Sequence, residues 1–236
     1  MKLQYAVPGS GDIIKIKGLS KTYGGREVLS IDSLTLRQGR KYAVIGPNGS
    51  GKSTLIRIIA GVIQADNGQV EIGTQKHTIG YMPQTPYAFA RTVQKNVMLA
   101  LEGEADAAAM ALRALKRVGM GELSQSRGNR LSGGETQRMA FARMIAKPRI
   151  LLLLDEPTAA ADLTGEELME QTLLEYAKST GCTLLFSTHS PKQALHCADE
   201  LIVLCDGRVV EKGDAKAVIY APHNMDAQRF LANWRL

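Results

Sequence analysis

Apolar and polar positions near the start of the chain follow the pattern of β-strands. Apolar and basic side chains alternate around Ile13 to Ile16, and further strands are predicted at Leu34 to Arg37 and at Lys41 to Ile45. The Gln38-Gly39 pair between the last two has the composition of a turn. We therefore expect two of these strands to form an antiparallel flap.

The third of these strands ends in a glycine-rich turn. Beyond the turn, Ser53 to Ala60 has helical character, and Gly61 is a helix stop. A hairpin is expected next, formed by Val70 to Ile72 and Thr78 to Met82. The following segment, Thr92 to Val118, is rich in Ala, Leu, Met, Lys and Glu, a composition that predicts helix. The first half of the chain is thus a strand, turn and helix unit followed by helical sequence.

Helices and strands alternate again in the second half. Helices are expected after Gly133, from about Thr164 and near Pro191, and strands at Ile150 to Leu154, Thr183 to Ser187 and Leu201 to Cys205. Asp206-Gly207 is a strong hairpin signal before Arg208 to Glu211, because both central residues of such a turn need positive φ. These patterns predict an α/β fold with a mixed sheet, an N-terminal antiparallel β subdomain and an inserted helical subdomain.

The composition is that of a folded protein, with 44% hydrophobic and 22% charged residues. No apolar stretch reaches the roughly 18 to 20 residues of a membrane span. The start, Met1 to Gly11, lacks the apolar core of a secretory signal. We therefore expect a soluble, cytoplasmic chain.

Neither the net charge nor the cysteine spacing identifies a partner or a metal site. The formal charge of +6 is compatible with nucleic acid, an anionic membrane surface or a phosphate-rich ligand, but the basic residues are scattered along the chain. Cys182, Cys197 and Cys205 are spaced 15 and 8 residues apart, which fits neither a metal knuckle nor a C-x-x-C redox pair. We expect three reduced cysteines in or near the core.

The strongest chemical motif lies between an apolar strand and a predicted helix. It fits the phosphate-loop pattern G-x-x-x-x-G-K-[ST] and consists of Gly46, Pro47, Asn48, Gly49, Ser50, Gly51, Lys52 and Ser53. Glycines let successive backbone N–H groups turn toward an anion, and the helix start adds its positive dipole end. Lys52 is expected to reach the β- and γ-phosphates, Ser53 to bind Mg²⁺ and Thr54 to contact the α-phosphate side.

Two carboxylates follow a second buried strand. Residues 150–154 are all apolar and lead directly into Asp155 and Glu156. In α/β sheets, ligands bind outside the carboxyl ends of the strands. Beside a phosphate loop, this order predicts that Asp155 holds Mg²⁺ through water and that Glu156 takes a proton from the attacking water.

A third motif stands at the start of a predicted helix and consists of Leu131, Ser132, Gly133, Gly134 and Glu135. With the two motifs above, it resembles the signature of ATP-binding cassette (ABC) ATPases. Small residues at a helix start let backbone N–H groups approach an anion closely. One chain would then carry two phosphate-binding helix starts for one triphosphate. The resemblance implies that the signature of one subunit closes over the phosphate loop of another.

Further positions match this family in the expected order. Tyr23 resembles the aromatic residue that stacks on adenine, Gln84 the glutamine that touches Mg²⁺ and the attacking water, and His189 the histidine at the γ-phosphate. Asp162 resembles the aspartate that reaches across the dimer. The resemblance therefore implies ATP and Mg²⁺ as cofactors. It also implies catalytic roles for Lys52, Gln84, Glu156 and His189, and a metal site of Ser53, Gln84 and Asp155.

The resemblance extends from about Ile13 to Glu211 and has two departures. Ala161 stands where the family commonly has Leu, which removes apolar packing beside Asp162, and Thr136 stands where a glutamine often follows the signature. Because the catalytic positions are all occupied, two equivalent sites per homodimer are expected. The resemblance implies a phosphate-loop NTPase core and one ABC ATPase domain over 1–236, with core segments at about 12–84 and 150–236 and a helical insert at about 85–149.

The resemblance also implies partners. These are a second ATPase chain in a homodimer or pseudo-dimer, integral membrane permease subunits, a substrate-binding protein and no nucleic acid. A permease helix docked near Thr85 to Leu101 would hold the chain on the inner face of the cell membrane. A chromosome or DNA-repair ATPase would need a long coiled coil between the motifs, which the 80 residues from Lys52 to Ser132 do not supply.

The compact insert and the short tail from Ala221 to Phe230 resemble those of importers of small inorganic oxyanions such as tungstate, molybdate or phosphate. Two alternatives stay open. One is an importer of amino acids or metal ions, and the other is a non-transport ATPase that acts with a soluble scaffold, as in iron–sulfur cluster assembly.

Overall fold

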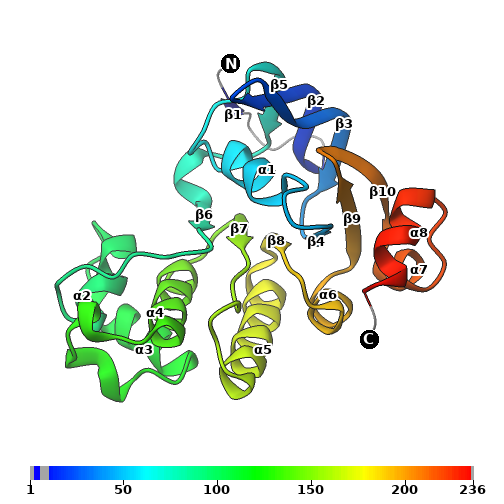
Figure 1. Ribbon diagram of the computed structural model, residues 1–236. Helices are drawn as coiled ribbons and strands as arrows, with labels where there is room; N and C mark the ends of the chain where they lie inside the picture. The colour runs from blue at the N-terminus through cyan, green and yellow to red at the C-terminus, as the bar shows by residue number, and fades with distance from the viewer. Residues whose placement is uncertain (1–2, 6–10, 235–236) are drawn as a thin grey trace.

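The computed structural model describes residues 3–5 and 11–234 and contains two β-sheets with helices around them (Figure 1). Most of Met1 to Gly11, the stretch expected to lack a secretory signal, lies outside the described residues. Among the described residues, no helix combines the length and the apolar character needed to cross a membrane.

The smaller sheet contains the expected antiparallel flap. Its strand order is β1-β5-β2-β3, formed by β1 (Gln4–Tyr5), β5 (Asn67–Ile72), β2 (Asp12–Tyr23) and β3 (Arg26–Arg37). β2 and β3 pair antiparallel along almost their whole length and are joined by a turn at Gly24 and Gly25, which have φ of 55° and 81°. The flap is confirmed, and its two strands are longer than the sequence pattern indicated.

The larger sheet carries the chemistry-bearing strands. Its order is β10-β9-β4-β8-β7-β6, formed by β10 (Arg208–Asp214), β9 (Glu200–Cys205), β4 (Lys41–Ile45), β8 (Thr183–Ser187), β7 (Leu151–Asp155) and β6 (Ile79–Met82). All neighbours pair parallel except β9 and β10. Asp206 and Gly207 join these two strands with φ of 45° and 78°, as the hairpin signal predicted. The predicted α/β class with a mixed sheet is confirmed.

The hairpin expected between residues 70–72 and 78–82 is wrong. β5 pairs with β2 and β1 in the smaller sheet, whereas β6 pairs parallel with β7 in the larger one. The physical reason is burial: Val70 and Ile72 pack in the core of the flap, and Met82 packs in a different core on the other side of the larger sheet. The short polar connection has the composition of a tight turn, but it crosses between sheets.

Helices cover both faces of the larger sheet (Figure 1). α1 (Lys52–Ile59) lies between the two sheets, and α5 (Leu163–Thr180) and α6 (Pro191–Cys197) lie on the opposite face with α7 (Ala215–Tyr220) and α8 (Met225–Ala232) beyond them. The helical group after β6 contains α2 (Val93–Met98), α3 (Ala107–Arg117) and α4 (Gly133–Ile145). The helix expected over 92–118 is interrupted between α2 and α3, where Gly103 has φ of 84°.

The central strands of the larger sheet bury both faces, and their residues alternate between two cores. Tyr42 and Val44 of β4 point toward α1 and the flap, whereas Ala43 and Ile45 point toward the remaining helices. β7 alternates in the same way. Two-sided burial explains why residues 151–154 form a continuous apolar run. It also fixes the strand ends, from which the phosphate loop and the two carboxylates emerge at one edge of the sheet.

Candidate active site

The phosphate-loop segment connects β4 to α1 in a conformation that glycine makes possible. Gly46, Gly49 and Gly51 have φ of 151°, 78° and 102°, values that disfavour other residues. A Cβ atom on Gly46 would lie 2.0 Å from the Leu204 carbonyl oxygen, so the backbone of β9 leaves no room for a side chain there. The Gly207 N–H also donates to the Ser50 carbonyl at 3.1 Å. The loop is therefore held from the side by the β9–β10 hairpin.

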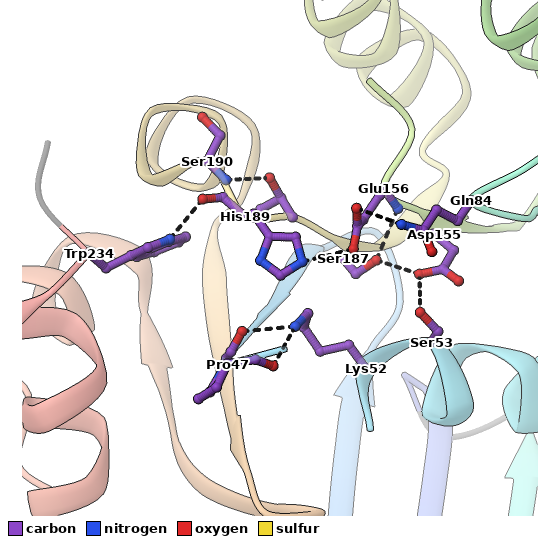
Figure 2. Close-up of polar contacts among 12 residues, drawn as sticks. Pro47, Lys52, Ser53, Gln84, Asp155, Glu156, Ser187, His189, Ser190 and Trp234 are labelled. Atoms are coloured by element: carbon purple, nitrogen blue, oxygen red, sulfur yellow. Dashed lines mark hydrogen bonds and ion pairs between the residues drawn. The ribbon is translucent and has the colours of Figure 1, made fainter. Parts of the chain in front are cut away.

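Lys52 lies buried at the start of α1, with 5% of its surface exposed. Its ammonium group donates to the carbonyl oxygens of Gly46 at 2.8 Å and Pro47 at 2.9 Å (Figure 2). Burial lowers the pKa of Lys52, and the charges of Glu156 and Asp155 act in the opposite direction. An anion in the loop would favour the charged ammonium further.

Asp155 is the centre of a hydrogen-bond network at the end of β7. Its Oδ1 accepts from the hydroxyl groups of Ser53 at 2.9 Å and Ser187 at 2.7 Å (Figure 2). Asp155 is fully buried, and its Oδ2 has no hydrogen-bond partner among the described residues. A buried, unsatisfied carboxylate oxygen is costly unless a ligand completes it.

Glu156 is oriented by contacts from several segments. Its Oε2 accepts from Gln84 Nε2 at 3.0 Å, and its Oε1 lies 2.9 Å from His189 Nε2 (Figure 2). Its backbone N–H donates to Ser187 Oγ at 3.0 Å, and its carbonyl accepts from Gln137 Nε2 at 2.9 Å. Glu156 also has φ of 48°, a strained value for a residue with a side chain. Such fixed orientation is the property required of a general base.

An open cavity of about 920 Å³ brings these groups together. It is lined by Asn48 to Thr54, by Gln84, Glu156 and His189, and by Arg26 and Val28 of β3. Its size is that of a ligand site. Tyr23 lies at the end of β2 with 49% of its surface exposed, and the Lys21 ammonium is 5.2 Å from its ring centre. Tyr23 is not among the lining residues, so its predicted stacking role stays a prediction.

The signature residues lie outside this cavity, at the start of α4. Ser132 caps the helix by accepting from the Glu135 N–H at 3.3 Å, and Glu135 accepts from the Ser132 N–H at 2.8 Å. This backbone hydrogen bond lowers the pKa of Glu135. Leu131, Gly133 and Gly134 complete the segment, and none of the five residues lines the cavity. The chain therefore has one helix start, that of α1, inside the cavity and another, that of α4, outside it.

Asp162 also lies outside the cavity. It caps α5 by accepting from the Gly165 N–H at 2.8 Å, and its Oδ1 is 3.9 Å from an Arg138 guanidinium nitrogen. Its side chain is 76% exposed, so it remains accessible to a second molecule. Ala161, the departure from the family pattern, is half-buried against the helical core.

Sequence reasoning missed several residues of the site. Ser187 joins Asp155 to the Glu156 backbone, and Gln137 joins Glu156 to the Ala160 N–H at 2.7 Å. Trp234 donates from its indole to the His189 carbonyl at 2.8 Å. Ser187 ends a predicted strand and Gln137 follows the signature by two positions, but neither belongs to a motif. Gln137 and Trp234 become neighbours of the site through folding, without a local sequence signal.

Comparisons with known proteins identify the family. The sequence profile of the family described as "ABC transporter" matches residues 29–159. The tungstate uptake system ATP-binding protein TupC of Peptoclostridium acidaminophilum is 38% identical over 84% of this chain and 97% of its own length. A spermidine/putrescine import ATP-binding protein of Vibrio parahaemolyticus is 32% identical over 93% of this chain, which spans 62% of that relative.

Solved structures agree. A dimeric ATP-binding cassette in a post-hydrolysis state, bound to ADP and Pi, is 27% identical and has a TM-score of 0.80 over 86% of this chain and 99% of its own. A subunit of a Clostridium perfringens ABC transporter complex is 26% identical, with a TM-score of 0.77 over 90% of this chain and 92% of its own.

Proposed function

Since the chain belongs to the ABC transporter family, as an ATP hydrolase of the importer type, we propose that it powers the import of a small inorganic oxyanion, with tungstate as the first candidate. The observation that carries the enzymatic part is the convergence of the phosphate loop, Ser53 and Glu156 in one cavity, with Asp155 bonded to Ser53 directly behind it.

The side chains divide the work of hydrolysis. The loop N–H groups and Lys52 bind the β- and γ-phosphates, and Lys52 exchanges its two carbonyl contacts for phosphate oxygens. Glu156, oriented by Gln84 and His189, takes a proton from the attacking water. His189 Nε2 faces the same cavity and stabilises charge that develops at the γ-phosphate.

The residues at the end of β7 fit a magnesium ion. Mg²⁺ prefers oxygen ligands and keeps several waters, and the buried Asp155 Oδ2 lacks a partner among the described residues. Ser53, Asp155 and Gln84 would hold the ion, directly or through water. When bound, it would neutralise charge on the phosphates.

A complete site requires a second chain under this proposal. The start of α4 lies outside the cavity. A phosphate bound only there would meet neither Lys52 nor Glu156, which belong to the cavity. Dimers close both sites when each signature covers the partner's phosphate loop. Asp162, exposed at the start of α5, would contact the partner. We retain the division into core segments at 12–84 and 150–236 and a helical insert at 85–149 as part of this proposal.

A groove beside α2 supports docking of a membrane permease. A second cavity of about 640 Å³ lies along α2 and the loop after it, with Arg91, Leu99 and Glu102 among its lining residues. Tyr87 and Phe89, which precede it, are 69% and 42% exposed and meet edge to face at 4.9 Å. Exposed aromatic residues are enriched at protein interfaces. A permease helix there would hold the chain at the inner face of the membrane.

The cargo proposal rests on relatives. The tungstate-system protein is 38% identical to this chain, and the polyamine-system protein is 32% identical. A tungstate importer would include a substrate-binding protein that selects the oxyanion. Alternatives are an importer of polyamines, amino acids or metal ions, and a scaffold-associated ATPase.

The test is uptake in a strain that lacks this chain. We expect loss of radiolabelled tungstate uptake, restored by the wild type and by Glu167→Gln but not by Glu156→Gln. Glu167 is a matched control, because it is an exposed glutamate on α5 that faces Lys192 and lies away from the cavity. Intact tungstate uptake in the deletion strain would overturn the cargo. Turnover by purified Glu156→Gln at the wild-type rate would overturn the role of Glu156.

A further inference from the structure

The indole of Trp234 contacts the backbone of the histidine that faces Glu156. Its Nε1 donates to the His189 carbonyl at 2.8 Å, although 45 positions separate the two residues. In Figure 2 the indole lies on one side of His189 and Glu156 on the other. The two contacts of His189 therefore connect the C-terminal part of the chain to the carboxylate that acts as base.

Trp234 is itself fixed by α8. Ala227 and Leu231 of this helix are 0% and 8% exposed and pack into the main core. The Trp234 N–H donates to the Leu231 carbonyl at 3.0 Å, and the rings of Phe230 and Trp234 lie 5.4 Å apart. The indole thus approaches His189 from a segment that directly follows α8 and is anchored by it. An indole has one N–H donor and no acceptor, so this contact has a defined direction.

The segment around His189 is held mainly through its backbone. The Thr188 N–H donates to the Val44 carbonyl at 3.3 Å, and the Ser190 N–H donates to Thr188 Oγ1 at 3.0 Å. The His189 side chain is 43% exposed, so packing alone does not orient its ring. The Trp234 contact restrains the carbonyl of His189 itself, and with it the direction in which the ring leaves the backbone.

We propose that Trp234 is a positioning residue for ATP hydrolysis, which holds His189 so that Nε2 faces Glu156 and the γ-phosphate. The inference rests on the ATP hydrolysis assigned above and is independent of the cargo. Preorganised groups speed a reaction because they need not reorganise as charge develops. Loss of the indole N–H should therefore lower turnover and leave ATP binding to the phosphate loop unchanged.

The experiment replaces the indole by a ring without a donor. Trp234→Phe keeps the aromatic contact with Phe230, and we expect kcat to fall about three- to tenfold, the effect of one neutral hydrogen bond. The KM for ATP should change by less than about twofold, because Trp234 is not among the residues that line the cavity. Asn233→Ala is the matched control: its amide donates only to the Arg229 carbonyl at 3.2 Å, in the same segment, and its kcat should stay at the wild-type value.

The same substitution in the variant His189→Ala distinguishes a positioning role of Trp234 from a role in folding alone. In His189→Ala, single-turnover hydrolysis should be equally slow with Trp or Phe at position 234, because the two side chains act as a unit. Trp234 is the only tryptophan of the chain, so its emission reports this contact, and ATP should shift it more than ADP does. The inference is overturned if kcat is unchanged in Trp234→Phe, if the two substitutions are additive, or if ATP leaves the emission unchanged. Absence of turnover in the wild type would instead remove the ATPase function itself.

Discussion

Two inactive variants should restore each other's activity if each site is built from two chains. Lys52→Ala removes the ammonium group from the phosphate loop, and Gly133→Asp places a carboxylate at the signature. In a mixed dimer, the phosphate loop of the Gly133→Asp chain faces the signature of the Lys52→Ala chain, and both are intact. The other site of that dimer carries both defects.

The structure makes Gly133→Asp a clean perturbation. A Cβ atom on Gly133 would meet only the Ala160 Cβ, at 3.8 Å, which is ordinary contact. The residue begins α4, where an aspartate is favoured by about 0.3 to 1 kcal/mol through the helix dipole. Gly134 would be a poorer choice, because its Cβ would lie 2.8 Å from the Ala160 carbonyl oxygen. Gly133→Asp should therefore keep the fold and repel only a phosphate presented by the partner.

The expected magnitudes follow from these contacts. Each variant alone should lose about 100- to 1,000-fold in kcat, as when one charge-stabilising group is removed from a reaction centre. Random mixing of equal amounts gives half mixed dimers with one intact site of two, so about one quarter of the wild-type sites should return. The assay is steady-state ATP hydrolysis of the mixture. ATP-dependent association of differently labelled chains is a second readout, which does not depend on whether one site can turn over alone.

The matched control is the double variant Lys52→Ala/Gly133→Asp, which creates no intact site with either single variant and should restore nothing. Two results would refute the reasoning. One is a mixture that shows neither recovered hydrolysis nor ATP-dependent association of labelled chains. The other is full activity of Gly133→Asp by itself.

Three further predictions concern single side chains. Tyr23→Ala should raise the KM for ATP about 10- to 100-fold with little change in kcat, and Tyr23→Phe should not, because stacking on adenine is worth about 1 to 3 kcal/mol; equal kinetics in all three proteins would remove the stacking role. Burial raises the pKa of Glu170, so its contribution to stability is fully present below the unfolded pKa of about 4.3 and is lost as pH rises through the higher folded pKa. The free energy of unfolding in urea should therefore fall less from about pH 4 to about pH 7 in Glu170→Gln than in the wild type. An identical fall in both proteins would contradict this. Burial raises the pKa of both Cys182 and Cys197 to about 12, so a thiol reagent should label only the more exposed Cys205 in the folded protein, as peptide mapping can establish.

The sequence was sufficient for the elements whose burial is uniform or whose turn chemistry is strict. The continuous apolar run of β7 and the Asp206-Gly207 pair both predicted what the structure contains. The prediction of a hairpin over residues 70–82 was wrong because neither condition holds there. β5 and β6 are short, and each is stabilised by partners far away in the chain, so their pairing depends on β2 and β7 and not on the turn between them.

The same distinction applies to the site. The phosphate loop and the two carboxylates at the end of β7 are contiguous motifs, and folding brings Glu156 into the cavity of the loop and Asp155 against Ser53. Gln137 and Trp234 act on Glu156 and His189 through backbone carbonyls. Every residue has a backbone carbonyl, so a hydrogen bond to a carbonyl depends little on the identity of the residue that accepts it. The sequence around the donor and the acceptor therefore does not predict the contact. Backbone contacts of this kind need the structure.

Gln84 and His189, whose side chains contact the Glu156 carboxylate, belong to segments with different neighbours. This difference bears on how transport and hydrolysis are coupled. Gln84 lies at the end of β6, only three positions before the exposed Tyr87 that precedes the groove beside α2. His189 is connected to α8 through Trp234. A partner in the groove can change hydrolysis only if it binds more tightly to one arrangement of these contacts than to another. The Gln84–Glu156 hydrogen bond, at 3.0 Å, is the contact best placed to differ between such arrangements, because Gln84 lies close to the groove residues in the sequence. The His189 side is restrained by Trp234, which follows a helix anchored in the core by Ala227 and Leu231. We therefore expect the permease to change the orientation of Glu156 through the Gln84 contact, while the His189 contact stays in place.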